Sequence, residues 1–178
     1  KSIELNQLVQ QILMPFKEQI ETRRMKIVLG DLPTLHGNSS QWKSVLGNLI
    51  RNALVYQEKS RVAEIRIWTE QDEGFYYVFI QDNGIGIDPK YQQKIFEMFE
   101  RLHTDTEYPG SGIGLALCKK IVEGWGGKIT LESLGLHQGT TVKITLPLID
   151  ISLLSHLEKK SNLEHILDPQ DPSEGIYT

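Results

Sequence analysis

The chain has 178 residues, of which 39% are hydrophobic and 24% charged, a composition typical of an ordinary soluble globular domain with its own core. No stretch approaches the roughly 18 consecutive apolar residues of a membrane span, and a single cysteine, Cys118, excludes an internal disulfide. The net charge of −4 comes entirely from residues 150–178, so residues 1–149 offer no basic surface. We therefore expect neither a nucleic-acid partner nor direct membrane contact from this chain.

Apolar residues at helical spacing predict a helix over residues 5–24, which Pro15 interrupts, after residues 1–4 that resemble the end of a linker. A short strand follows over residues 25–29. A second helix is expected to open at Asn38, because asparagine is a good N-cap and Gln41 completes a capping-box pattern. Its buried face is expected to comprise Trp42, Val45, Leu46, Leu49, Ile50 and Ala53.

The second half of the chain is dominated by strands. Residues 65–70 and 75–81 predict a hairpin. A poorly periodic stretch, residues 88–110, leads into a third helix that starts within a glycine run and continues to about Glu123; Cys118 lies in this helix and is interpreted as a packed thiol. The last strand pair is expected over residues 128–133 and 140–146.

This order of elements bears on the fold class. A doubly wound parallel sheet needs single strands alternating with helices, whereas paired strands between helices favour a mixed sheet with its helices on one face, a two-layer α/β sandwich. Residues 1–149 are expected to form this domain. Residues 150–178 are expected to be an acidic tail, with a short amphipathic helix followed by disorder after Asp168.

Asp82 follows an apolar strand and precedes the sequence Asn-Gly-Ile-Gly. A carboxylate accepts hydrogen bonds and cannot donate them, so it suits the exocyclic amine of adenine. Gly84 and Gly86 would let the chain turn sharply and let a flat ring approach the backbone. Taken alone, the segment is equally consistent with a plain turn after a strand.

Residues 110–115 read Gly-Ser-Gly-Ile-Gly-Leu and lead directly into a helix. Free N–H groups at the start of a helix bind phosphate oxygens. The spacing differs from that of the dinucleotide fingerprint, and no Walker sequence occurs, so both of those readings are disfavoured. A flexible glycine hinge remains the alternative.

Asn48 and Asn52 are four residues apart, and Tyr56 continues the same helix face. Two amides inside a helix are mildly unfavourable for its formation, which suggests that they have a function. One amide oxygen could ligate Mg²⁺ while triphosphate oxygens and water complete the octahedron, and Tyr56 could pack on the adenine. The alternative is a solvated polar face.

Together these segments resemble the GHKL ATPase superfamily and, more narrowly, the catalytic domains of sensor histidine kinases. The resemblance covers residues 5–148, and the wording of residues 101–114 is particularly similar to phytochrome-type histidine kinases. The matching segments are residues 48–53 (N box), 82–86 (G1 box), 96–101 (F box), 110–115 (G2 box) and 138–141 (final glycine box).

The resemblance implies the Bergerat ATP-binding fold, with ATP and Mg²⁺ as cofactors. It implies that Asn52 coordinates Mg²⁺, that Asp82 bonds the adenine amine, and that residues 88–110 form a mobile lid over the nucleotide. The nucleotide-binding residues expected on this basis are Asn48, Asn52, Tyr56, Asp82, Gly84, Gly86, Arg101, Gly110, Ser111, Gly112, Gly114, Leu115 and Thr141.

The resemblance also implies partners. The acceptor histidine and its base would belong to a separate helical dimerisation domain upstream of this chain, so no catalytic residue is expected here, and phosphate would pass on to a response regulator. A homodimer would form through the missing N-terminal region. The expected location is cytoplasmic, or the cytoplasmic side of a membrane-tethered receptor.

One departure from the family pattern concerns activity. The family usually has Lys or Arg three residues after the second N-box asparagine, where this chain has Val55; the nearest cations in the sequence that could substitute are Arg51 and Lys59. The competing hypothesis is therefore a degenerate GHKL module that serves as a nucleotide-sensing or partner-binding scaffold. A GHKL ATPase of the topoisomerase or mismatch-repair type is disfavoured by the F box and the short chain.

Overall fold

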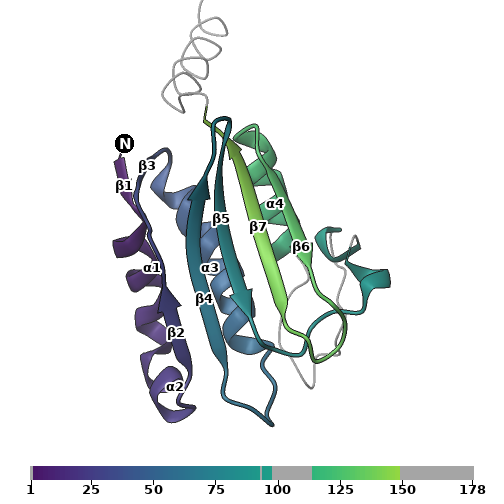
Figure 1. The fold of residues 1–178 in the computed structure, drawn as a ribbon. Helices are drawn as coiled ribbons and strands as arrows, with labels where there is room; N and C mark the ends of the chain where they lie inside the picture. Colours follow the sequence, from purple (N-terminus) through teal and green to yellow (C-terminus); the bar gives the residue numbers. More distant parts are fainter. Residues whose placement is uncertain (1, 93, 98–113, 149–178) are drawn as a thin grey trace, which may run out of the picture.

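A five-stranded mixed sheet with helices packed on one face forms the body of the protein (Figure 1). The structure, a computed structural model, describes residues 2–92, 94–97 and 114–148. Strands lie in the order β2–β4–β5–β7–β6; β2 pairs parallel with β4, and every other neighbouring pair is antiparallel. The two-layer α/β sandwich expected from the sequence is confirmed.

The bounds of the elements follow chain order. The strands are β1 (Ser2–Glu4), β2 (Lys26–Leu29), β3 (Thr34–His36), β4 (Glu64–Gln71), β5 (Phe75–Asp82), β6 (Lys128–Glu132) and β7 (Thr140–Pro147). The helices are α1 (Leu5–Leu13), α2 (Lys17–Thr22), α3 (Ser39–Val55) and α4 (Gly114–Gly124). Single 3₁₀ turns are η1 (Met14–Phe16), η2 (Pro89–Tyr91) and η3 (Lys94–Phe96).

The structure confirms the helix break at Pro15 and the cap at Asn38, but not the full capping box predicted with Gln41. Pro15 lies in η1, which separates α1 from α2, because proline lacks the N–H that a continuous helix requires. Asn38 caps α3, its Oδ1 accepting from the backbone N–H groups of Ser40 and Gln41. The reciprocal bond of a capping box is replaced by another contact: Gln41 Oε1 accepts from Trp125 Nε1 at 2.9 Å, which ties the start of α3 to the end of α4.

A second, two-stranded sheet was missed in the sequence. Ser2–Glu4 pairs antiparallel with Thr34–His36, so the prediction that residues 1–4 end a linker is wrong for the three residues that form β1. Strands of three residues are too short to show a period of two, and their partners are distant along the chain. Among the described residues no helix is both long and apolar enough to cross a bilayer.

Strand alternation gives the main sheet two different faces. The face toward α3 and α4 carries buried aliphatic residues, and all six residues predicted for the buried stripe of α3 lie in the core with them. No helix of the described residues covers the opposite face (Figure 1), which carries Trp68 and Phe79, stacked with ring centroids 4.8 Å apart. Whether a strand residue stands at an odd or an even position, its parity, therefore decides whether its side chain faces the helices.

Candidate functional site

Helix α3 meets both the turn after Asp82 and the start of α4, where the described part of the second glycine segment lies. Near its middle, a Cβ atom at position 114 would lie 2.6 Å from Asn48 Oδ1, so the start of α4 rests against this amide. At its C-terminal end, the carbonyl of Tyr56 accepts from Ile85 N at 3.0 Å, and a Cβ at position 84 would lie 2.0 Å from the same oxygen. Position 84 requires glycine because the atom it would meet is backbone, and both contacts are made by α3.

Asp82 ends β5 on the helix-covered face, because it shares strand parity with the buried Ile80. It is half-buried, and its Oδ1 accepts from Gly84 N at 2.8 Å. Burial raises the pKa of this carboxyl to about 7, against the opposing effect of the N–H groups of Gly84 and Thr140 and the guanidinium of Arg61. A ligand amine that donates to Asp82 would favour the charged form.

Two further glycines interlock the turns around Asp82. Gly86 has φ +67°, and a Cβ there would lie 2.1 Å from the carbonyl oxygen of Gly135. Gly139 has φ +71°, and a Cβ there would lie 2.1 Å from the carbonyl oxygen of Asp82 itself. Both positions need the left-handed backbone that glycine adopts without strain. The segment after β5 and the turn before β7 therefore pack backbone to backbone.

Asn52, the residue predicted to ligate Mg²⁺, lies on α3. Its side chain is half-buried and has no hydrogen-bond partner within the described residues, whereas Asn48 Nδ2 donates to Ser44 O at 2.8 Å. No group of three or more His, Cys, Asp or Glu side chains that could hold a metal occurs in the described part of the chain. The donors fit Mg²⁺ held by one amide oxygen and by oxygens of a bound phosphate chain.

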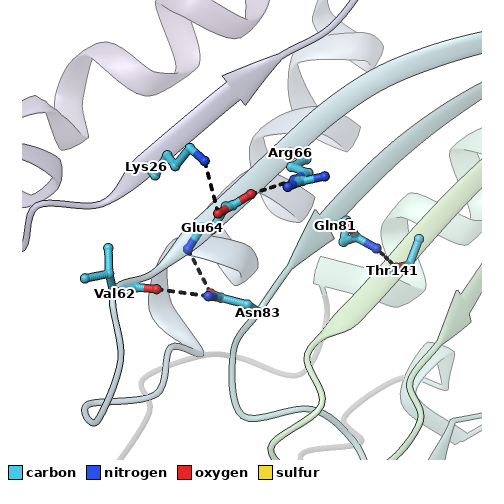
Figure 2. A network of polar contacts seen from close by, with 7 residues as sticks. All are labelled: Lys26, Val62, Glu64, Arg66, Gln81, Asn83 and Thr141. Atoms are coloured by element: carbon cyan, nitrogen blue, oxygen red, sulfur yellow. Dashed lines mark hydrogen bonds and ion pairs between the residues drawn. The ribbon is translucent and has the colours of Figure 1, made fainter.

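The structure places Thr141 away from this site. Its hydroxyl accepts from Gln81 Nε2 at 3.1 Å on the helix-free face, where Figure 2 shows the two side chains together. Its neighbour Thr140 pairs with Asp82 in register and shares the parity of the buried Val142. Alternation in β7 could have indicated Thr140 rather than Thr141 from the sequence alone.

Two positioning residues were missed in the sequence. Asn83 Oδ1 accepts from Glu64 N at 2.8 Å, and its Nδ2 donates to Val62 O at 2.9 Å, which fastens the turn after β5 to the start of β4 (Figure 2). Arg61 Nη2 donates to the carbonyl oxygens of Gly84 and His137. The Asn-Gly pair signalled a turn, but no local pattern marks Arg61.

The remaining predicted residues divide into two groups. Leu115 lies in the first turn of α4, half-buried, with its side chain packed against the core. A ligand could therefore meet it only through its backbone. The others, Arg101, Gly110, Ser111 and Gly112, lie outside the described residues. Most of the predicted lid, residues 88–110, lies outside them as well. Of the lid, the structure describes the turns η2 and η3, and Phe96 of the predicted F box packs against the core.

Residue 118 is buried in α4, and its thiol donates to the carbonyl of Val45 at 3.7 Å. Burial raises the pKa of Cys118 to about 12. The expectation of a packed thiol is confirmed.

Comparison with known proteins agrees with this geometry. Residues 37–150 match the family described as histidine kinase-, DNA gyrase B-, and HSP90-like ATPase. The chain is 39% identical over 146 residues to the phytochrome-like protein Cph1 of Synechocystis, covering 82% of this chain and 19% of that protein. It is 30% identical over 155 residues to the histidine protein kinase SaeS of Staphylococcus aureus, covering 84% of this chain and 44% of SaeS.

Solved structures show the same fold. The catalytic domain of histidine kinase ThkA superposes with a TM-score of 0.68 at 25% identity, covering 83% of this chain and 96% of that domain. The chain spans about a fifth of the length of the cyanobacterial phytochromes that it matches. With a family match over residues 37–150 and the shared fold, the chain belongs to the histidine kinase-, DNA gyrase B-, and HSP90-like ATPase family and, within it, to the ATP-binding catalytic domains of sensor histidine kinases.

Proposed function

We propose that this domain binds Mg-ATP along α3 and presents the γ-phosphate to a histidine of a separate helical dimerisation domain, from which a response regulator takes the phosphate. The observation that carries the proposal is the convergence on one helix of the turn after Asp82, which meets Tyr56, and the start of α4, which meets Asn48. Adenine and phosphate contacts would thus lie at two ends of one site.

Each side chain has a distinct role in this proposal. The Asp82 carboxylate accepts a hydrogen bond from the adenine amine, and Tyr56 packs on the base. Asn52 holds Mg²⁺, which neutralises phosphate charge. Backbone N–H groups at the start of α4, from Gly114 onward, bind phosphate oxygens. Asn48 supports them, since its amide lies directly against Gly114.

This chain would contribute positioning and charge neutralisation rather than a nucleophile. None of the described histidines has a partner arrangement that suggests an acceptor: His137 pairs with Glu58 at the turn before β7, and His36 lies on the short strand β3. From the family resemblance we infer that the acceptor histidine belongs to the dimerisation domain, through which the whole protein would form a homodimer at the cytoplasmic face of a membrane or in the cytoplasm.

A titration of Mg-ATP against the wild type, Asn52→Ala and Asp82→Asn tests the binding roles. Each substitution should weaken binding at least about tenfold, because each removes a metal or charged contact of roughly 1.5–3 kcal/mol. Asn6→Ala, an exposed asparagine on α1, is the matched control and should bind like the wild type. Equal affinities in all four proteins would refute the assignments.

A nucleotide-sensing or partner-binding scaffold is the second candidate, and Val55 is the observation that favours it. Val55 is the last residue of α3 and is half-buried, so it offers no charge to a phosphate. Phosphotransfer to a supplied dimerisation domain carrying its histidine separates the two functions. Transfer supports the kinase, whereas binding without transfer, together with gain of transfer in Val55→Lys, supports the scaffold.

A further inference from the structure

Arg61 joins three segments that lie apart in the sequence. It belongs to the loop between α3 and β4, and its Nη2 donates to the carbonyl oxygen of Gly84 at 3.0 Å and to that of His137 at 2.6 Å. Gly84 lies in the turn that follows Asp82, and His137 in the turn that precedes β7. One guanidinium thus spans both turns that frame Asp82.

The two turns also bond to each other beside the arginine. Gly139 N donates to Gly84 O at 3.2 Å, and His137 N donates to Ile85 O at 2.7 Å. The Gly84 carbonyl therefore accepts from both Arg61 and Gly139, while the N–H of Gly84 donates to Asp82. Displacing the guanidinium would free one side of Gly84, the residue whose N–H holds the carboxylate in place.

We propose that Arg61 is a positioning residue for the adenine end of the site: it fastens the turn that orients Asp82 and supplies the positive charge that faces this carboxylate. The proposal rests on the proposed function, because it gives Arg61 its importance through the hydrogen bond that Asp82 would accept from adenine. No substrate contact by Arg61 itself is required.

The electrostatic surroundings support the second half of this role. Burial disfavours the charged form of Asp82; the N–H groups of Gly84 and Thr140 oppose this effect, and the positive charge of Arg61 adds to their opposition. Glu58 pairs with His137 on the same side of the turn, so a carboxylate and an imidazole also lie near Arg61. Without Arg61, less of Asp82 would be ionised at neutral pH, and adenine would lose its acceptor.

The test is the affinity for Mg-ADP between pH 5.5 and 8.5 in the wild type, Arg61→Met and Arg61→Lys. In the wild type the affinity should decrease as the pH is lowered through a midpoint near the pKa of Asp82, about 7. Arg61→Met should move this midpoint up by about half a pH unit or more and weaken binding at pH 7 about two- to fivefold. Arg61→Lys keeps the charge but not the planar guanidinium whose Nη2 reaches both carbonyls, so it should lose affinity with little shift of the midpoint.

Two control variants exclude other causes. Arg66→Met removes an arginine that pairs with Glu64 on the helix-free face (Figure 2) and should leave the profile unchanged. His137→Asn removes the imidazole and keeps the backbone bonds, since asparagine tolerates the φ of +65° at this position; it should leave the midpoint in place. Because ADP titrates identically in every arm, its own protonation cancels in the differences between variants.

An unmoved midpoint in Arg61→Met, with affinity reduced equally at every pH, would overturn the electrostatic role, and wild-type affinity throughout would overturn the whole proposal. If the wild type binds no nucleotide, the proposed function fails instead. The ¹³C carboxyl titration of Asp82 in the nucleotide-free protein then still decides the matter: a higher midpoint in Arg61→Met supports the role of Arg61, and an equal one refutes it.

Discussion

Asp82→Asn should make the nucleotide-free protein more stable while it weakens nucleotide binding. Burial raises the pKa of this carboxyl from 3.8 to about 7. Between these values the folded chain binds more protons than the unfolded chain, so the stability contributed by Asp82 is present below about pH 4 and is lost as pH rises through 7. Asparagine keeps an acceptor for Gly84 and Thr140 but carries no charge.

The magnitude follows from the same two pKa values. A difference of about 3 pH units corresponds to about 4 kcal/mol at alkaline pH, and access of water to this half-buried side chain reduces the expected gain to roughly 2 kcal/mol. Urea unfolding of the wild type and Asp82→Asn at pH 5 and pH 8 measures it. A gain that is larger at pH 8 than at pH 5 is expected; a variant that is no more stable at pH 8 would refute the reasoning.

Three further predictions follow from individual contacts. Gly84→Ala should destabilise the fold by at least about 2 kcal/mol in urea unfolding, because its Cβ would overlap the carbonyl of Tyr56, whereas Gly47→Ala in α3 meets open space and should be neutral or stabilising by up to about 1 kcal/mol. Thr141→Val should change Mg-ATP affinity less than about twofold, since its hydroxyl bonds on the far face; a larger loss would restore its predicted role. Cys118 should react with a thiol reagent only on unfolding, and rapid labelling of the native protein would contradict its burial.

Local patterns were sufficient where a long element buries one face. The stripe of α3 and the pairing of β4 with β5 could both be predicted, because seventeen- and eight-residue elements repeat their period often enough to be recognised. The strands β1 and β3 have three residues each and could not. Gln41 was expected to complete a capping box, yet its Oε1 accepts a hydrogen bond from Trp125, which directly follows α4.

In the candidate site, too, local features could be predicted and contacts between distant segments could not. The turn formed by Asp82, Gly84 and Gly86 could be predicted, because a turn after a strand needs particular residues at fixed positions, while the nucleotide-binding roles of these residues stay predictions. The choice between Thr140 and Thr141 depends on which face of the sheet the helices cover. The role of Arg61 depends on two turns meeting across the sheet, and neither turn is its neighbour along the chain.

By itself, then, the amino-acid order determined the family of this protein, its elements of regular structure and the glycine turns, because each of these depends on residues close together in the chain. Tertiary structure alone decided that α3 meets both the turn after Asp82 and the start of α4, that burial raises the pKa of the carboxyl at the end of β5, and that an arginine from a distant loop opposes this effect. Burial and charge are properties of what surrounds an atom, and those surroundings come into being only when the sheet and its helices pack.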